Sequence, residues 1–151
     1  MIIGIDPGKR GGLAICDNNL ISVYSFKDKS ELEIAQRIRR ATERTKAVCY
    51  LEKVHSAPGQ GVASMFAFGQ AYGFIRGVIS TLGIPIVDVT PRVWQRALRV
   101  PPKNGKSYRE HKKLLQEIAK KLYPINGVNA ETADALLIMH YGRAIENKMD
   151  I

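Results

Sequence analysis

The start of the chain contains three short runs of apolar positions, each with the length and composition of a β-strand. The runs cover 2–6, 12–17 and 20–26, and they are rich in Ile, Leu and Val. Glycines separate the first two runs, and Asp17-Asn18-Asn19 separates the second from the third; such residues favour tight turns. The pattern therefore predicts three strands joined as an antiparallel meander.

Beyond residue 26, helical periods of apolar positions alternate with further strand patterns. Ser30 and Glu33 form a capping box that predicts the start of the first helix. The other expected elements, in chain order, are a strand over 48–54, a helix over 62–82, a strand over 84–89, a short helix from Thr90-Pro91, a helix over 107–123 and a helix over 131–146. This order predicts an α/β fold in which helices flank a five-stranded mixed sheet, as a single domain over residues 1–151.

Three glycines recur every four residues along the expected helix over 62–82: Gly69, Gly73 and Gly77. Each glycine costs a helix about 1 kcal/mol relative to alanine. Three in register indicate close packing of this face against another element. The sheet of the same chain and a helix of a second subunit are equally good candidates, and the second makes these glycines a dimer interface.

The composition is that of a globular protein, with 45% hydrophobic and 25% charged residues. No apolar run approaches the length of a membrane span, and no basic-then-apolar leader precedes the first strand. We therefore expect neither membrane association nor a signal peptide. Cys16 and Cys49 fall inside expected strands, and we interpret them as small buried side chains in a reducing compartment rather than as a disulfide or a metal pair.

The net charge of +9 is concentrated in one segment. Ten basic residues and only two acidic ones lie between Arg92 and Lys121, a net of +8. A solubilising surface is the alternative, but this concentration favours a polyanion, and nucleic acid above all. The candidate DNA contacts in this segment are Arg92, Arg96, Lys103, Lys106, Arg109, Lys112 and Lys113.

Candidate chemistry begins with Asp6, a carboxylate that directly follows four strand residues and precedes Pro7-Gly8. Carboxylates are seldom buried unless their charge is compensated, and a metal ion is the obvious partner here. Glu52 occupies a similar place at the end of the expected strand over 48–54. Because strand side chains alternate faces, Asp6 and Glu52 can meet near the centre of the sheet if these two strands are neighbours.

Glu131 and Asp134 supply two more carboxylates, three residues apart and therefore on one side of the expected last helix. Oxygen-rich sites of this kind suit Mg²⁺ or Mn²⁺. Two ions about 3.5–4 Å apart, shared by Asp6, can activate a water and stabilise the leaving oxygen in phosphodiester hydrolysis. Four catalytic and metal-binding residues are therefore expected: Asp6, Glu52, Glu131 and Asp134.

Each of these acids also has a purely structural interpretation. Asp6 can be a turn former before Pro-Gly, Glu52 a surface carboxylate paired with Lys53, and Glu131 a first-turn acid stabilised by the helix dipole. For Asp134, which precedes a run of apolar residues, this interpretation is the weakest. Trp94 is interpreted as a packing residue in preference to a platform for base stacking.

Four features together resemble the RuvC-type Holliday junction resolvases, the crossover junction endodeoxyribonucleases. They are Gly4-Ile5-Asp6-Pro7-Gly8, Glu52, Gly69-Gln70-Ala71 with Gly73, and Ala133-Asp134-Ala135-Leu136. The resemblance covers nearly the whole chain. It is closest to phage and chloroplast forms, since Ala-Leu-Leu-Ile followed by Tyr141-Gly142 is similar to the chloroplast resolvase.

The resemblance implies an RNase H-like fold, a homodimer, and Mg²⁺-dependent, symmetric nicking of four-way DNA junctions in recombination and repair. It places the four acids as metal ligands and the protein in the cytoplasm of a bacterium or of a phage-infected host, with an organelle as the alternative. His55 stands where the bacterial enzymes carry a junction-wedging aromatic, so we expect it to contact DNA. Lys106 and Lys112 are both candidates for a family lysine that stabilises phosphate charge.

Other functions stay open at this stage. A non-catalytic protein that binds branched DNA could share the fold, and so could an RNase H-like nuclease that acts on flaps or RNA. An actin-like nucleotide-binding protein also opens with Gly-Ile-Asp-x-Gly. The chain is too short for the two lobes of that fold and has no second phosphate loop, so we expect no nucleotide cofactor.

Overall fold

The structure is a computed structural model that describes residues 1–53, 61–105 and 107–149. In this described part the chain forms five strands and five helices. In chain order they are β1 (Ile2–Asp6), β2 (Gly12–Asp17), β3 (Leu20–Ser25), α1 (Glu31–Thr42), β4 (Val48–Glu52), α2 (Val62–Thr81), β5 (Ile86–Val89), α3 (Pro91–Ala97), α4 (Tyr108–Leu122) and α5 (Ala133–Asn147). The predicted elements are all present, with ends that differ by a few residues.

The strands form one mixed sheet in the order β3-β2-β1-β4-β5. β1, β2 and β3 pair antiparallel, as the predicted meander requires, whereas β4 runs parallel to β1 and β5 runs parallel to β4. β1 is therefore the central strand, with one neighbour of each kind. The predicted five-stranded mixed sheet flanked by helices is confirmed.

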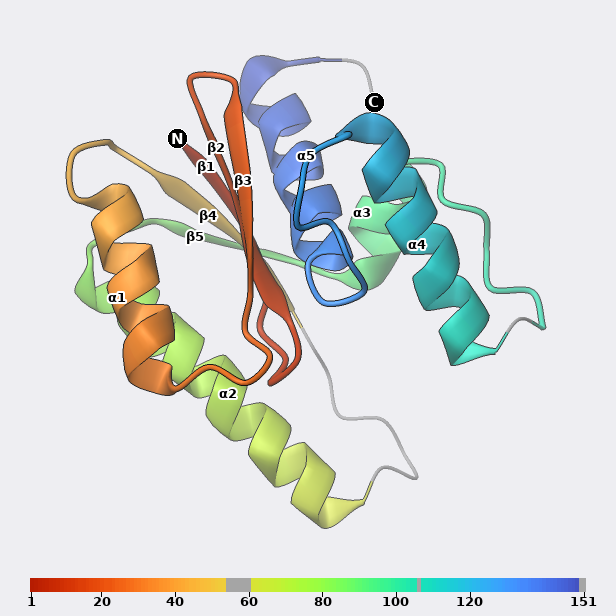
Figure 1. The fold of residues 1–151 in the computed structure, drawn as a ribbon, viewed down its shortest axis with the longest axis horizontal. Coiled ribbons are helices and arrows are strands. Elements are labelled where there is room, and N and C mark those ends of the chain that lie inside the picture. Colours follow the sequence, from red (N-terminus) through yellow and green to blue (C-terminus); the bar gives the residue numbers. More distant parts are fainter. Residues whose placement is uncertain (54–60, 106, 150–151) are drawn as a thin grey trace.

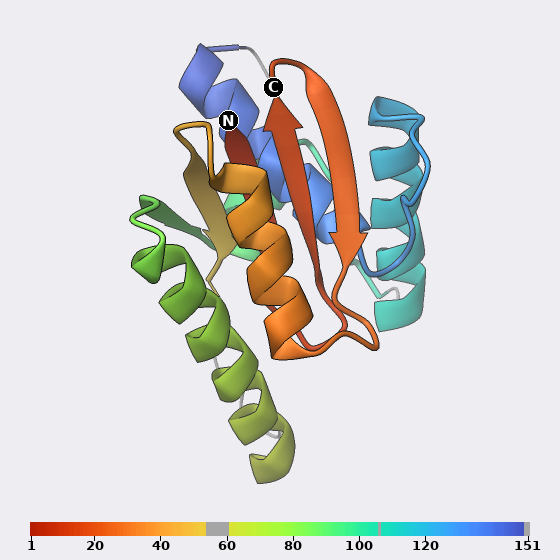
Figure 2. The same ribbon diagram turned by 60° about the vertical axis from the view of Figure 1, so that its left-hand side comes forward.

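The helices cover both faces of the sheet (Figures 1 and 2). α1 and α2 bury one face, with Ile34, Ile38, Ile75 and Ile79 packed against the apolar side chains of β1, β2 and β4. α3, α4 and α5 cover the other face. α5 lies across β1 so closely that a Cβ atom on Gly4 would overlap the backbone of Ala135 and Met139. This close approach brings the first turn of α5 to the central strand.

Local capping sets where the helices begin. The predicted capping box of Ser30 and Glu33 is present at α1, and Ser107 and Glu110 form a second one at α4. α5 begins two residues later than predicted, and the expectation that Glu131 lies on this helix is wrong. Asn129 Oδ1 accepts hydrogen bonds from the backbone N–H groups of Glu131 and Thr132, which holds this segment in a turn.

In the described part of the chain, nothing packs closely against the glycine face of α2. A Cβ atom on Gly69, Gly73 or Gly77 would meet no described atom within 4 Å. The prediction that this face packs closely against the chain's own sheet is therefore wrong, and the alternative of a second subunit stays a prediction. The two glycines nearer the helix end, Gly73 and Gly77, line a groove between α1 and α2.

α2 also projects beyond the sheet at its N-terminal end, where Val62 and Phe66 are strongly exposed (Figure 1). By length and composition α2 could cross a membrane, and it is the one described helix that could. This corrects the expectation that no apolar run approaches that length. Helices that pack against other protein have the same length and composition, so these two properties alone do not place α2 in a membrane.

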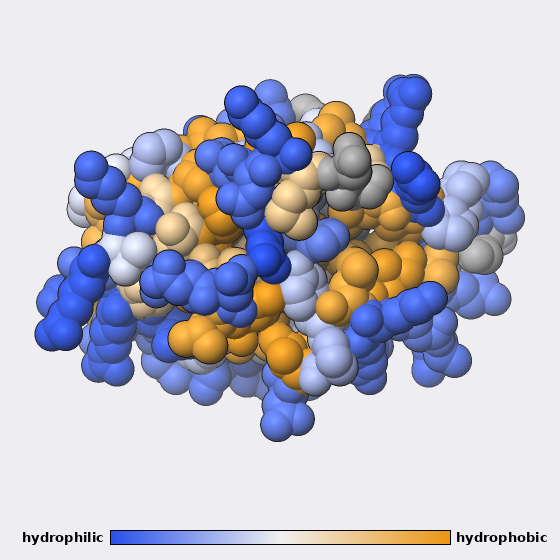
Figure 3. Space-filling view, turned by 90° about the horizontal axis from the view of Figure 1, so that it is seen from above, coloured by the Kyte–Doolittle hydropathy of each residue, from blue (hydrophilic) through white to orange (hydrophobic). Residues whose placement is uncertain are grey.

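The end of the molecule that holds the N-terminus is seen from above in Figure 3, with hydrophilic side chains at its rim and apolar ones gathered between them.

Within the chain, Cys16 and Cys49 are both buried and free, as predicted for small apolar side chains.

Candidate active site

Three carboxylates meet where β1, β4 and the start of α5 come together. Asp6 is the last residue of β1 and Glu52 is the last residue of β4. The parallel register pairs Ile5 with Leu51, so the two acids are neighbours one position further along. Asp134, in the first turn of α5, reaches the same place because α5 crosses β1. The predicted meeting of Asp6 and Glu52 thus follows from strand pairing.

These acids line one cleft of about 730 Å³. Glu52 and Asp134 are 7% and 5% exposed, and Asp6 is partly buried. The interpretation of Glu52 as a surface carboxylate paired with Lys53 is therefore wrong. Asp6 does act as a turn former, since its Oδ1 accepts a hydrogen bond from the backbone N–H of Gly8 at 3.1 Å. Its Oδ2 faces Lys112 instead, so the two roles coexist.

Lys112 of α4 brings a positive charge into the cleft. Its Nζ lies 2.5 Å from Asp134 Oδ2 and 3.9 Å from Asp6 Oδ2. Burial disfavours the charged lysine, but the carboxylates of Asp134 and Asp6 outweigh it and raise the pKa of Lys112. Lys112 is therefore a cation in this site. The second lysine candidate, Lys106, lies outside the described residues.

Glu52 is held from the core side by Trp94. The indole Nε1–H donates a hydrogen bond to Glu52 Oε1 at 3.0 Å. Trp94 is fully buried, which confirms the predicted packing role, but the contact with Glu52 was not predicted.

Two acids of the cleft, Glu52 and Asp6, have raised pKa values. Burial is the main cause of the raised pKa of Glu52, which reaches about 8, and the charges of Asp6 and Asp134 add to it. The pKa of Asp6 is raised by burial and by Asp134, against the opposing effects of Lys112 and the Gly8 N–H. Strongly shifted groups that share a cleft are typical of functional sites, and the causes here are burial first and neighbouring carboxylates second.

Glu131 lies apart from this trio. Its side chain accepts a hydrogen bond at 3.0 Å from Arg10, a residue of the β1–β2 loop. That hydrogen bond is the main reason why the pKa of Glu131 is lowered. Glu131 lines the same cleft, but it precedes α5 and therefore does not share a helix face with Asp134. The sequence offered no signal for the Arg10 contact.

Most of the predicted DNA-contacting side chains can be placed. Arg109 and Lys112 line the cleft. The others that the structure describes are exposed on α3, on the following loop or on α4: Arg92, Arg96, Lys103 and Lys113. The Nζ atoms of Lys103 and Lys112 each lie 5.9 Å from the ring centroid of Tyr108, an exposed aromatic residue that lines the cleft. His55 lies outside the described residues, so its predicted DNA contact stays a prediction.

Basic side chains engage three of the four acids that line the cleft. Within the described ranges, no three His, Cys, Asp or Glu side chains are grouped so that they could hold a metal ion. Lys112 binds Asp134 and approaches Asp6, while Arg10 binds Glu131. One acceptor is left over: the buried Oδ1 of Asp134 has no hydrogen-bond partner in the described part of the chain.

No protein-family model and no curated protein matches the chain. Among solved structures, it is similar to RuvC from Thermus thermophilus in complex with a Holliday junction substrate, with a TM-score of 0.64 and 15% sequence identity over 97% of this chain and 95% of that one. A second Thermus thermophilus RuvC structure gives a TM-score of 0.58 and 17% identity with the same coverage. The likeness extends over the whole fold, and the predicted RNase H-like architecture of RuvC is confirmed for this chain.

Proposed function

We propose that this protein is a divalent-metal-dependent DNA endonuclease that resolves four-way junctions by paired, symmetric nicks. The observation that carries the proposal is the convergence of Asp6, Glu52 and Asp134, from three separate elements, in one cleft flanked by basic side chains. A protein that only binds DNA has no reason to place poorly solvated carboxylates beside phosphates, because like charges repel there.

The fold adds support of a different kind. A RuvC structure with this fold is described in complex with a Holliday junction substrate. The chain also carries a net charge of +9, with ten of its basic residues between Arg92 and Lys121. Branched DNA is therefore the substrate class that the proposal takes.

The donor set fits a hard divalent cation such as Mg²⁺ or Mn²⁺. All the candidate ligands are carboxylate oxygens, the type that these ions prefer. The buried Oδ1 of Asp134 lacks a hydrogen-bond partner among the described residues. Burial first, and neighbouring carboxylates second, raise the pKa values of Asp6 and Glu52, and a bound cation would offset both effects. Asp6, Glu52 and Asp134 would hold the ions, and Glu131 would join them on leaving Arg10.

When bound, two such ions supply Lewis-acid activation of a water and of the scissile phosphate. The chain's own residues supply position and charge. Lys112 and Arg109 line the cleft and can each hold a phosphate oxygen, which offsets charge that builds up on the phosphate during attack. Lys112 would exchange its contact with Asp134 for the phosphate as a cation enters. Asp6, at the end of the central strand, is fixed by the Gly8 N–H on one oxygen.

Paired nicks call for two active sites, and we include a homodimer in the proposal. A four-way junction has two-fold symmetry, and a two-fold dimer presents the same cleft to both cut strands. The open glycine face of α2, at Gly69, Gly73 and Gly77, is the candidate interface. Its glycines would allow a second helix to approach closely, and this offers a reason for three residues that cost a helix stability.

The test is cleavage of a labelled four-way junction against a linear duplex of the same sequence, in Mg²⁺, Mn²⁺ or EDTA. The wild type is compared with Asp6→Asn, and Asp17→Asn at the end of β2 serves as the matched control. Metal-dependent paired nicks that are abolished in Asp6→Asn but kept in Asp17→Asn, with junction binding unchanged in both, support the proposal. Tight junction binding without cleavage in any metal would favour a non-catalytic branched-DNA-binding protein. Cleavage of flaps or of RNA alone would indicate that the substrate is one of these and not a four-way junction.

A further inference from the structure

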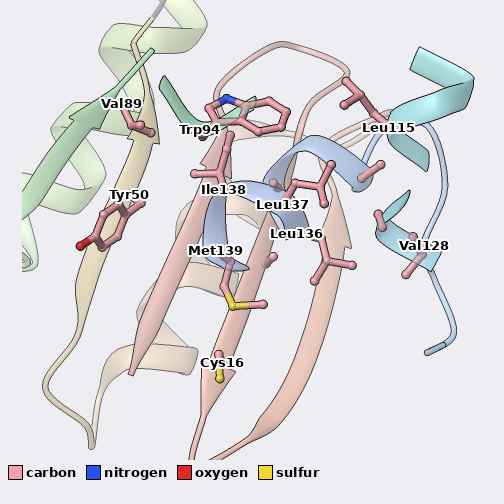
Figure 4. Close-up of a cluster of buried hydrophobic side chains, with 14 of the residues drawn as sticks. Cys16, Tyr50, Val89, Trp94, Leu115, Val128, Leu136, Leu137, Ile138 and Met139 are labelled. Carbon is pink, nitrogen blue, oxygen red and sulfur yellow. The ribbon is translucent and has the colours of Figure 1, made fainter. Parts of the chain in front are cut away.

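Trp94 is a core residue with one polar contact, and that contact is to a carboxylate of the candidate site. The side chain is fully buried among the apolar residues of α4, α5 and the sheet. In Figure 4 its ring lies above Ile138, with the indole nitrogen on the side away from this cluster of side chains. The N–H donates to Glu52 Oε1, and Glu52 lines the cleft while Trp94 does not. Glu52 therefore lies between the indole and the cleft.

The chain builds this contact with few residues. Val89, the last residue of β5, pairs with Glu52 in the parallel ladder, and Lys53 N–H donates to Val89 O at 2.7 Å just beyond the pair. α3 begins two residues later at Pro91, a favoured first position of a helix. One turn into α3, Trp94 therefore lies over the end of β4. The register of β4 and β5 fixes where the indole N–H points.

We propose that Trp94 is a positioning residue for the metal-binding carboxylate Glu52, an inference that rests on the proposed nuclease function. Its N–H fixes Oε1 of Glu52 and leaves the other oxygen for the cleft. A glutamate has three rotatable side-chain bonds, and an anchored oxygen removes much of that freedom before a cation arrives. The restraint would raise metal affinity by reducing the ordering that binding requires.

The chemistry of the donor matters as much as its position. An indole N–H only donates and carries no charge, so it orients the carboxylate without repelling a divalent cation. Lys112 differs in this respect, because its ammonium competes with a cation for Asp134 and Asp6. Trp94 would therefore hold Glu52 ready to bind a metal ion. Lys112 would hold Asp134 and Asp6 until a metal ion takes its place.

Trp94 is the only tryptophan in the chain, which allows an atom-level test. Full replacement of tryptophan by β-(3-benzothienyl)alanine exchanges the N–H for sulfur and keeps the size of the ring. Replacement by 4-fluorotryptophan keeps the N–H and is the matched control. Mn²⁺ binding is measured by titration calorimetry without DNA, and junction cleavage is measured as a function of Mg²⁺ concentration.

We expect the benzothienyl protein to bind Mn²⁺ about 10–100-fold more weakly, the usual cost of losing an outer-shell partner of a metal ligand. Its Mg²⁺ requirement for cleavage should rise by a similar factor, while saturating Mg²⁺ restores much of the rate. The 4-fluorotryptophan protein should behave as wild type in both measurements. Unchanged Mn²⁺ affinity in a benzothienyl protein that still folds would overturn the inference.

Trp94→Phe and Val100→Ala separate positioning from packing. Both remove volume from the same apolar cluster, but only Trp94→Phe removes the donor to Glu52. Weaker Mn²⁺ binding in Trp94→Phe alone supports the positioning role, whereas an equal loss in Val100→Ala would overturn it. If the wild type binds Mn²⁺ in this site but cuts no branched DNA, the proposed function is wrong. The effect of Trp94 on Mn²⁺ affinity can still be measured in that case.

Discussion

The Nζ atom of Lys112 lies 2.5 Å from Oδ2 of Asp134, and both side chains are largely shielded from water. A buried carboxylate next to other carboxylates needs a positive charge close by, and Lys112 provides it. The lysine therefore stabilises the metal-free protein in the place where a divalent cation would later do so. The same ammonium lies 3.9 Å from Asp6 Oδ2, so one lysine serves two carboxylates.

Removing this ammonium should destabilise the metal-free protein more than the metal-bound one. We expect Lys112→Met to lower the free energy of unfolding by about 3 kcal/mol in EDTA, because breaking a buried ion pair leaves an uncompensated charge. Excess Mg²⁺ should recover much of that loss. Urea unfolding followed by circular dichroism measures both conditions.

Lys113→Met is the matched control, since Lys113 is the exposed neighbour of Lys112 on α4. We expect it to change stability by less than about 0.5 kcal/mol in either condition, as is usual for surface substitutions. An equal loss in Lys112→Met with and without Mg²⁺ would argue against exchange between the lysine and a cation.

The pH dependence of stability should carry the signature of Glu52. Its pKa is about 8 in the folded chain against an ordinary value of 4.5, so between these values the folded state binds more protons than the unfolded state. The free energy of unfolding must then fall as pH rises through this window. The raised pKa of Asp6 acts in the same direction.

Urea unfolding in EDTA at a series of pH values from about 5 to about 8 measures this slope. Glu52→Gln keeps an acceptor for the Trp94 N–H but removes the titrating group, so we expect a shallower slope and a higher stability near pH 8. A variant with the wild-type slope would show that Glu52 is ionised throughout the window.

Strand alternation predicted that Asp6 and Glu52 can meet if their two strands are neighbours. The sequence did not show that neighbour relation, and the parallel pairing of β1 with β4 in the structure supplies it. The same argument placed Asp134 only in part, because its position depends on α5 lying directly on Gly4. The side-chain period of a helix or strand can be predicted from the sequence more easily than the distance at which two elements pack.

The errors have local causes. Glu131 was placed on the last helix because its spacing to Asp134 is helical, but the Asn129 side chain bonds the backbone and delays the start of α5. The cost of Gly69, Gly73 and Gly77 indicated packing without saying against what. The Trp94–Glu52 contact depends on the register of β4 and β5, which no single segment encodes.

The open glycine face of α2 leads to a prediction about assembly. We expect Gly73→Gln to shift the protein toward monomer, because a long polar side chain would keep a second helix from approaching closely. Within the isolated chain the change should stabilise α2 by up to about 1 kcal/mol, since glycine is a poor helix former and a Cβ there would meet no atom of the described residues within 4 Å. Sedimentation equilibrium measures the association and urea unfolding the stability.

Gln36→Ala on the neighbouring α1 tests the groove without touching the glycine stripe. Weaker association in Gly73→Gln alone supports the glycine face as the interface. A wild type that is monomeric at all concentrations, alone and on junction DNA, would remove the dimer from the proposal.

If basic side chains around the cleft bind DNA phosphates, they should contribute to the salt dependence of junction binding. Arg109 lines the cleft beside Lys112, and we expect it to bind a DNA phosphate. Removing one cation that binds a phosphate should reduce the slope of log K against log salt by about 1, because fewer counterions are released on binding. Arg109→Ala should therefore bind the junction more weakly at low salt and with a shallower slope, as measured by fluorescence anisotropy.

Arg40→Ala is the control with the same change of charge. Arg40 is exposed near the C-terminal end of α1, next to the segment that leads into the start of β4, whereas the cleft lies where β4 ends. If net charge alone drives binding, the slope falls equally in both variants. If the cleft is the DNA site, the slope falls by a unit in Arg109→Ala and keeps the wild-type value in Arg40→Ala, because only a cation that touches a phosphate displaces a condensed counterion.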